Sequence, residues 1–185
     1  MRGKGARRRD ELARAAASLV LREGPGALSH RRVALEAGAS LSATTYYFAS
    51  LDDLAAAAGH ALADAWADRA RTVLAGAPST PVRLEPEAAA AVLTDAVLPA
   101  GDDDQVRSHY EQLLGAGRHP AVATAFAAGR SVVDGVLADL VARVGAPTSA
   151  AVTIALVDGA VVTALSEQRP VRATARALLL EAWGA

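Results

Sequence analysis

Hydroxyl-bearing side chains are concentrated between residues 40 and 47 of this chain, where the sequence reads SLSATTYY. The hydroxyl groups of serine, threonine and tyrosine form hydrogen bonds both with phosphate oxygens and with the edges of bases. A short helix that exposes such groups therefore suits the major groove of a duplex. The residues predicted to contact nucleic acid in this way are Ser40, Ser42, Thr44, Thr45, Tyr46 and Tyr47.

Two short helices joined by a tight turn are needed to position these hydroxyls. Val33 and Ala34 belong to an apolar stripe at helical spacing, and Ser29 is a suitable N-cap for the first helix. Gly38 is expected to end that helix, because glycine adopts positive φ at little cost. The pattern predicts a helix-turn-helix with Phe48 in its core, although it also fits a helical hairpin in an ordinary bundle.

Charge is distributed unevenly along the chain, whose formal net charge is −1. Residues 1–50 carry nine basic and four acidic residues, a net charge of +5, and the remaining residues carry −6. A basic end on an acidic body is the pattern expected of a protein that presents one end to a polyanion. A solubilising tail explains it equally well. The basic residues predicted to contact DNA are Arg7, Arg8, Arg9 and Arg31.

The composition excludes several classes of protein. The 185 residues are 52% hydrophobic but only 4% aromatic, and they include no cysteine, so disulfide frameworks and thiolate metal sites are excluded. No apolar segment of a signal peptide follows the charged N-terminus, and the longest apolar run, 150–165, contains an aspartate and two threonines. We therefore expect a cytoplasmic protein with no membrane partner.

Helical patterns alternate with glycine- and proline-rich breaks, and no convincing strand pattern or internal repeat is present. The sequence predicts an all-α fold of about nine helices, with three in a basic N-terminal head and about six in a bundle. We expect residues 1–49 to form a DNA-binding domain with a basic arm, and residues 50–185 to form a second, helical domain. The helices outside the helix-turn-helix are expected at about 7–23 (or from 10), 50–75, 87–98, 102–114, 120–144, 149–167 and 171–183.

A gap-free motif extends from the first short helix into the helix that follows the second. It reads Val33-Ala34-x-x-Ala37-Gly38-Ala39-Ser40, then Tyr46-Tyr47-Phe48-x-Ser50-x-x-Asp53-Leu54. This motif resembles the TetR family of transcriptional regulators over about residues 8–56. The resemblance implies a homodimer that binds a palindromic operator in double-stranded DNA. It also implies a repressor that a small-molecule effector releases from the operator, with residues 50–185 as the ligand-binding and dimerisation domain.

Three positions depart from the pattern common in that family. Ser42 stands where many relatives have glycine, Thr45 where many have tyrosine, and Leu51 where many have lysine. The resemblance gives the usual tyrosine and lysine a phosphate-binding role, which threonine and leucine cannot fill in the same way. We expect Tyr46, Tyr47, Thr44 and the arginine-rich arm to take over these contacts.

The residues of the C-terminal body carry no motif, so their roles are assigned from side-chain chemistry. Its few large aromatic side chains could line a pocket or simply fill the core. Asp158 interrupts an apolar helix, where a buried acid would need a partner such as Arg130, a ligand or a second subunit, and a solvated rim position is the alternative. The expected pocket residues are Leu62, Trp66, Tyr110, Leu113, Phe126, Arg130 and Asp158. The expected dimer-interface residues are Leu156, Gly159, Val162, Leu178 and Leu179, on the last two helices.

No constellation of catalytic or metal-binding residues is recognisable in the sequence. His60 and Asp64 share a helix face, but such a pair is more often a surface contact than a metal site. We find no glycine-rich phosphate loop and no G-x-S-x-G motif, so we predict no enzyme, no catalytic residue, no metal and no cofactor. The alternatives are a helical small-molecule-binding protein without DNA function and an enzyme that uses the body cavity. Salt-sensitive affinity for duplex DNA would exclude both.

Overall fold

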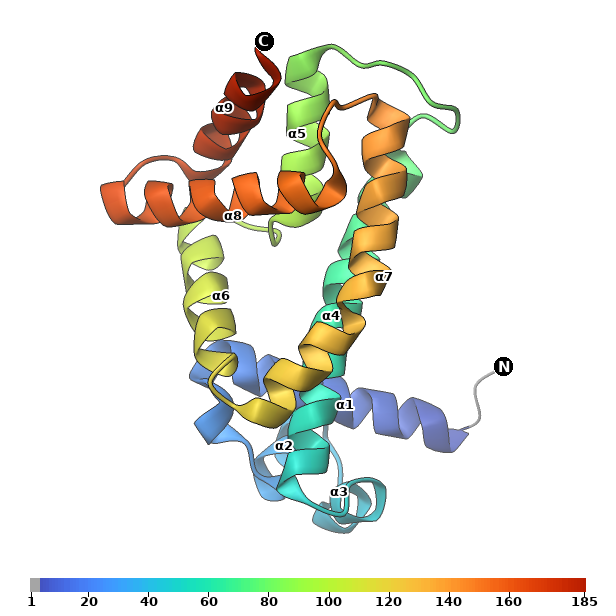
Figure 1. Ribbon diagram of the computed structural model, residues 1–185. Coiled ribbons are helices and arrows are strands. Elements are labelled where there is room, and N and C mark those ends of the chain that lie inside the picture. The colour runs from blue at the N-terminus through green and yellow to red at the C-terminus, as the bar shows by residue number, and fades with distance from the viewer. Residues whose placement is uncertain (1–3) are drawn as a thin grey trace. The chain divides into compact units, whose positions relative to one another are not determined.

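The computed structural model describes residues 4–185, and these form nine α-helices and one short 3₁₀-helix (Figure 1). The expected all-α fold is confirmed. The helices are α1 (Lys4–Glu23), η1 (Pro25–Ala27), α2 (His30–Glu36), α3 (Leu41–Tyr47), α4 (Leu51–Gly76), α5 (Pro86–Val97), α6 (Asp103–Ala116), α7 (Pro120–Val144), α8 (Ala150–Glu167) and α9 (Val171–Trp183).

The first helix begins earlier than the sequence pattern indicated. We expected this helix to start at Arg7 or Asp10, whereas α1 starts at Lys4. Residues 1–3 lie outside the described part of the chain. Arg8 and Arg9, in the second turn of α1, contact Gly38 and Phe48, and this tertiary packing stabilises the N-terminal part of the helix.

Serine side chains cap several helices, among them Ser29, whose N-cap role the sequence predicted. Ser50 and Asp53 form a reciprocal capping box at the start of α4, with N–H to side-chain oxygen distances of 3.0 and 3.1 Å. Gly38 follows α2 with φ of 56°, the left-handed conformation that glycine adopts cheaply. The other serine N-caps that accept a backbone N–H are Ser29, Ser40 and Ser149.

The described chain divides into two compact units. Unit 1 contains residues 4–65 and 108–130, and unit 2 contains residues 66–107 and 131–185. Helices α4, α6 and α7 each contribute residues to both units.

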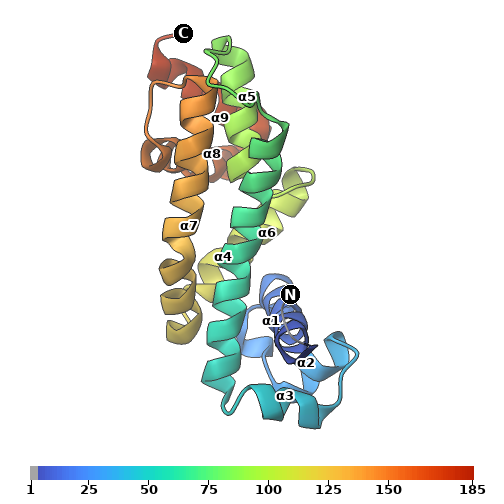
Figure 2. The ribbon, with the colours of Figure 1, turned by 90° about the vertical axis from the view of Figure 1, so that its right-hand side faces the viewer.

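Unit 1 is built around the three N-terminal helices and the first half of α4. Figure 2 shows α3 leading into the start of α4, with α2 next to α3. Their apolar faces meet in a single core in which Leu12, Val33, Phe48 and Leu54 are almost completely buried. The expected core position of Phe48 is therefore confirmed. This core fixes the orientation of α3 relative to α1 and α2.

Two glycines allow α4 and α7 to approach closely within unit 1. A Cβ atom added to Gly59 would lie 2.4 Å from the Val122 carbonyl oxygen, and one added to Gly129 would lie 2.4 Å from Cβ of Ala63. Real Cβ atoms do not come so close to other atoms. The glycines therefore set the spacing of this helix pair.

Unit 2 contains α5, α8 and α9, which pack against one another (Figures 1 and 2). The Arg172 guanidinium joins α9 to the end of α5, because it donates to Asp95 at 2.8 Å and to the Pro99 carbonyl at 2.6 Å. The Val171 N–H donates to the Asp103 carboxylate at 3.0 Å, which ties the start of α9 to α6. Polar contacts at the helix ends thus reinforce the apolar core.

Helices α7 and α8 are apolar enough, by length and composition alone, to pass a test for membrane-spanning helices. Core helices of water-soluble proteins pass the same test. In unit 2, Val133, Leu137 and Leu140 of α7 are completely buried, as are Val157 and Val161 of α8. The protein core accounts for part of this apolar character, since 22% of the apolar segment of α7 and 39% of that of α8 is buried.

Candidate nucleic-acid interface

Helix α3 exposes one continuous face to solvent. Leu41, Ser42, Thr45 and Tyr46 are all exposed, and they follow the i, i+1, i+4, i+5 spacing of one side of a helix. Tyr46 is 81% exposed and Leu41 is 51% exposed. A helix held by a core on one side and open on the other is the arrangement that a recognition helix requires.

The opposite face of α3 is locked into unit 1. Thr44 is completely buried, and its hydroxyl donates to the carbonyl oxygens of His30 and Ser40, both at 3.3 Å. The first of these bonds joins α3 to the start of α2. Thr44 therefore holds the two helices of the motif together from the inside.

The other short hydroxyls of this segment also have partners within the motif. Ser40 accepts the Ala43 N–H at 3.2 Å as the N-cap, and its hydroxyl lies 2.9 Å from that of Ser42. The Thr45 hydroxyl donates to the carbonyl oxygens of Leu41 and Ser42 at 3.3 and 3.2 Å. The hydrogen-bonding capacity of these groups is thus directed largely toward the helix itself.

The N-terminal part of α1 packs beside the helix-turn-helix. Arg8 donates to the Gly38 carbonyl at 3.3 Å and pairs with Glu11 at 2.8 Å. The Arg9 guanidinium lies over the Phe48 ring, 5.1 Å from its centre, in a cation–π contact. These contacts give the basic segment a fixed position next to α3.

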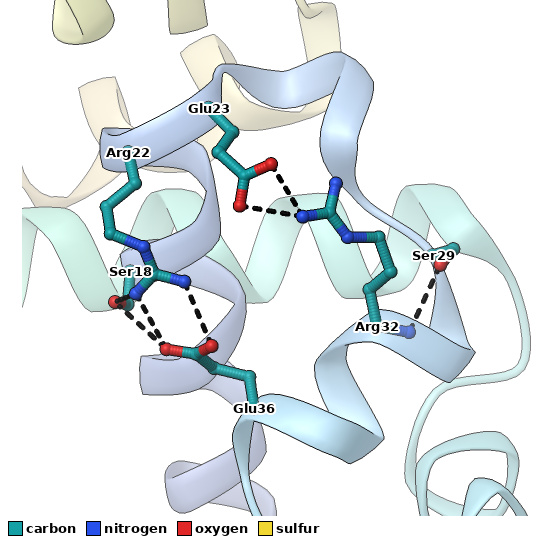
Figure 3. A network of polar contacts seen from close by, with 6 residues as sticks. All are labelled: Ser18, Arg22, Glu23, Ser29, Arg32 and Glu36. Carbon is teal, nitrogen blue, oxygen red and sulfur yellow. Dashed lines mark hydrogen bonds and ion pairs between the residues drawn. The ribbon is translucent and has the colours of Figure 1, made fainter.

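Two ion pairs connect α1 to α2 (Figure 3). Arg22 makes a bidentate contact with Glu36 at 2.7 and 2.9 Å, and it also donates to the Ser18 hydroxyl at 2.7 Å. Arg32 of α2 pairs with Glu23 at the end of α1 at 2.6 Å. The network holds the two helices in a fixed relation.

The partner arginines lower the pKa of both carboxyl groups. Hydrogen bonding to Arg22 is the main cause for Glu36, and hydrogen bonding to Arg32 is the main cause for Glu23. The ion pair with Glu36 in turn raises the pKa of Arg22. Both carboxylates therefore stay ionised below the pH at which an isolated glutamate would be half protonated.

Comparison with known protein families gives a match over the C-terminal half of the chain. Residues 84–185 match the family model described as "Tetracyclin repressor-like, C-terminal domain". The structure of a TetR-family member from Streptomyces coelicolor A3, SCO1917, is 30% identical, with 94% of this chain and 96% of that chain covered and a TM-score of 0.60. The chain belongs to the TetR family of transcriptional regulators.

Two further solved structures resemble this TetR-family chain to different degrees. The multidrug binding protein EbrR complexed with ethidium is 34% identical, covering 94% of this chain and 97% of that chain with a TM-score of 0.65. The regulator SCO7518 from Streptomyces coelicolor A3(2) shares the fold at 20% identity, with 97% and 99% covered and a TM-score of 0.67. A search of curated proteins found no match.

The structure of this TetR-family member separates the predicted DNA-contacting residues into three groups. Thr44 is buried, so its side chain cannot reach a phosphate or a base, and its hydroxyl is used for packing α3 on α2. Arg8, in α1, and Tyr47, at the end of α3, are half-buried. The exposed members are Arg7, Arg9, Arg31, Ser40, Ser42, Thr45 and Tyr46.

Apolar residues on the exposed surface were missed by the sequence reasoning, which looked only for polar groups. Leu35 is 83% exposed on α2, and Leu51 is 43% exposed at the start of α4. Leu41 opens the outward face of α3. The spacing of the sequence could have predicted this exposure, because Leu41 stands one helical turn before Thr45 and so lies on the same face of α3.

The predicted pocket residues of the TetR-type body are distributed over both units. Unit 2 contains Trp66 and Asp158, both half-buried. In unit 1, Leu62 is buried and Phe126 packs against the same core. The remaining pocket residues, all half-buried in unit 1, are Tyr110, Leu113 and Arg130.

A shallow depression of about 380 Å³ also lies on unit 1, between α4 and the start of α7. None of the predicted pocket residues lines it. Its lining consists of Ala56, His60, Pro120, Ala121, Thr124, Ala125 and Ala128. Among residues 4–185 there is no group of three acidic, histidine or cysteine side chains that could hold a metal ion.

The predicted interface residues of α8 and α9 differ in exposure. Val162 is 62% exposed and Gly159 is also exposed, whereas Leu179 is completely buried within the protomer. Leu156 and Leu178 are half-buried. The outward face of α8 is therefore the more accessible part of the predicted interface.

Proposed function

We propose that this TetR-family protein is a repressor that binds a palindromic operator as a homodimer and leaves the operator when a small-molecule effector binds. In this proposal, residues 1–49 form the DNA-binding domain and residues 50–185 the ligand-binding and dimerisation domain. The observation that carries the proposal is the exposed outward face of α3 in a family of DNA-binding regulators. The basic character of residues 1–50 supports it, because counterion release favours binding of a cationic surface to duplex DNA.

The phosphate contacts are proposed to come mainly from arginines around the motif. Arg7, Arg9 and Arg31 are exposed, and Arg9 is held beside the motif by its contact with Phe48. Their charges would give affinity and orientation without sequence information. The exposed phenol of Tyr46 can donate to a phosphate oxygen from α3 itself.

The dimer is proposed to form through the outward face of α8. Val152, Ala155, Gly159 and Val162 are exposed at intervals of three to four residues, so they lie along one side of this helix. Nothing lies within 4 Å of a Cβ added to Gly159, so a second helix could approach there closely. Pairing of this face across a twofold axis would bury an apolar stripe that one protomer leaves in water.

The effector is proposed to be an aromatic cation. The EbrR structure with bound ethidium is 34% identical to this chain. EbrR also forms complexes with proflavin and with malachite green. Ethidium, proflavin and malachite green are aromatic cations, which aromatic faces and carboxylates attract. We therefore propose Trp66 and Asp158, both in unit 2, as effector-contacting residues.

Selection from a random pool of duplex DNA tests the operator proposal. We expect recovery of a palindromic sequence that binds with an affinity falling steeply as salt increases. Recovery of no palindrome, or binding that salt does not change, would contradict it. A protein that binds small molecules but no DNA would instead support a binding protein without a regulatory role.

Ethidium binding should be measured on the DNA-free protein, because the dye also intercalates into duplex DNA. We expect quenching of tryptophan fluorescence in the Trp183→Phe variant, in which Trp66 is the remaining tryptophan.

Release from the operator by ethidium should then be compared with the release of an unrelated repressor from its own operator at the same dye concentration. Equal release of both proteins would mean that intercalation, not effector binding, causes the dissociation.

A further inference from the structure

We infer that base recognition by α3 depends on the C5-methyl groups of thymines in the operator. The inference rests on the proposed function, because it assumes that the exposed face of α3 lies in a major groove. It concerns the four residues of that face: Leu41, Ser42, Thr45 and Tyr46.

The face offers few free hydrogen-bonding groups to base edges. The hydroxyl of Thr45 is turned back to the carbonyl oxygens of Leu41 and Ser42. Because Cβ of threonine is tetrahedral, the methyl group is then the part of this exposed side chain that is directed away from the helix backbone. The Ser42 hydroxyl bonds to Ser40.

The face also lacks every side chain that recognises guanine, adenine or cytosine by charged or bidentate contacts. Guanine is read mainly by arginine or lysine, adenine by asparagine or glutamine, and cytosine by carboxylates. The α3 sequence LSATTYY contains none of these residues, and no arginine or lysine occurs from residue 33 to residue 68. Serine and tyrosine hydroxyls accept or donate and so discriminate weakly.

What remains is an apolar strip formed by Leu41 and the Thr45 methyl group. The two residues are one helical turn apart, so their side chains are neighbours on the helix surface. In the major groove the thymine C5-methyl is the apolar feature that distinguishes one base from the other three. Contact between the strip and such a methyl removes apolar surface from water on both partners.

Affinity and base recognition are thus separated on this surface. The arginines around the motif attract phosphates of any sequence, whereas the uncharged face of α3 discriminates by methyl contact. Burial of one methyl group corresponds to an affinity change of about fourfold. Several thymines per operator would multiply this factor.

The test replaces thymines of the selected operator by deoxyuridine, one position at a time. Uracil keeps the hydrogen-bonding groups of thymine and lacks only the methyl group. At fixed salt concentration, we expect at least one position in each half-site to lose about fourfold in affinity. Positions outside the half-sites should lose nothing and serve as the internal control.

Variants of Thr45 and Leu41 assign the effect to this face. Thr45→Ser keeps the hydroxyl and removes the methyl, so it should lose the preference for thymine over uracil at one position. Thr45→Val keeps a methyl and removes the hydroxyl, so it should retain that preference. Leu41→Ala should lose it at a neighbouring position. Both replaced residues are exposed, and thermal unfolding checks that each of the three variants is folded.

The possible failures are distinguishable. If the wild-type protein selects no duplex DNA, the proposed function fails and this inference fails with it. If the protein binds a palindromic operator but binds its uracil form equally well, only the inference is overturned. The inference is also overturned if Thr45→Ser keeps the preference for thymine and Thr45→Val loses it. The hydroxyl group of Thr45, and not its methyl group, would then recognise the base.

Discussion

Arg31 and Arg32 are adjacent in α2 but have different surroundings. Arg32 is held by Glu23 at 2.6 Å, whereas Arg31 is exposed and has no hydrogen-bond or ion-pair partner within residues 4–185. We expect Arg31→Ala to weaken DNA binding for all sequences and to reduce the slope of log affinity against log salt by about 1.

Arg32→Ala is the matched control for this prediction. It should leave the salt slope nearly unchanged and lower the thermal unfolding temperature, because it removes a contact between α1 and α2. Fluorescence anisotropy with labelled operator at four salt concentrations measures both slopes. A larger change of slope in Arg32→Ala than in Arg31→Ala would reverse the assignment.

Thr44 connects α3 to α2 through a buried hydroxyl. Thr44→Val keeps the shape of the side chain but leaves two carbonyl oxygens with one partner fewer. We expect a loss of about 1 kcal/mol in the free energy of unfolding, or roughly 2–4 °C in Tm. Calorimetry of Thr44→Val beside the exposed Thr45→Val checks this, since Thr45→Val should change Tm less.

Local roles such as helix capping could be predicted from the sequence, but the direction in which a helical side chain points could not. The N-cap role of Ser29 and the positive φ of Gly38 followed from local preferences, and the structure confirms both. The burial of Thr44 did not follow, because a threonine in a seven-residue helix can face either way until the core is packed. Tertiary contacts therefore decided which hydroxyls remain available for a ligand.

At the level of elements, α1 and α2 are joined by two carboxylates whose pKa values are lowered by arginines. A carboxyl group with a lowered folded-state pKa contributes stability above its unfolded pKa, and this contribution is lost as pH falls through the folded-state pKa. We therefore expect Tm to decrease as the pH is lowered from about 5 toward 3, measured by circular dichroism.

Glu36→Gln tests the origin of that pH dependence. The amide cannot ionise, so the variant should be less stable than the wild type at pH 7 and should approach it at pH 3. Glu11→Gln is a suitable control, because Glu11 pairs with Arg8 within α1 alone and does not join two helices. An unchanged pH profile in Glu36→Gln would show that other carboxyl groups cause the acid sensitivity.

The crossing of α4 and α7 in unit 1 depends on glycine. Gly59→Ala would place a Cβ 2.4 Å from the Val122 carbonyl, so the helices must separate. We expect a loss of about 1–3 kcal/mol in the free energy of unfolding, measured with urea. Gly135→Ala is the matched control in exposed helix, since nothing lies within 4 Å of its Cβ, and it should stabilise the protein by about 0.5–1 kcal/mol.

The close approach at Gly59 was invisible to the sequence patterns. Glycine in the middle of a helical stripe reads only as a weak helix former, whatever it packs against. The bounds of α7 at residues 120 and 144 were predicted correctly, because Pro120 and Gly145 mark them locally. Which two helices cross, and at which residue, depends on the whole core of unit 1.

At the level of the whole molecule, operator recognition in our proposal requires two protomers. A palindrome presents two half-sites, so a single head would lose the contacts of one of them. The exposed stripe on α8 is the surface proposed to join the protomers, and Val162 is its most exposed large side chain at 62%. In this proposal, the affinity for the operator therefore depends on dimerisation through α8.

Val162→Glu should separate the protomers, because a charge in an apolar seam would be buried without a partner. We expect sedimentation to show a monomer in place of the wild-type dimer and the affinity for the full palindrome to fall to that for an isolated half-site. Leu114→Glu is the control, since Leu114 is 70% exposed on α6 and lies outside the proposed seam. If the Val162→Glu protein remains dimeric, this face of α8 is not the dimer interface. If the variant is a monomer that still binds the full palindrome as tightly as the wild type, operator binding does not require a dimer.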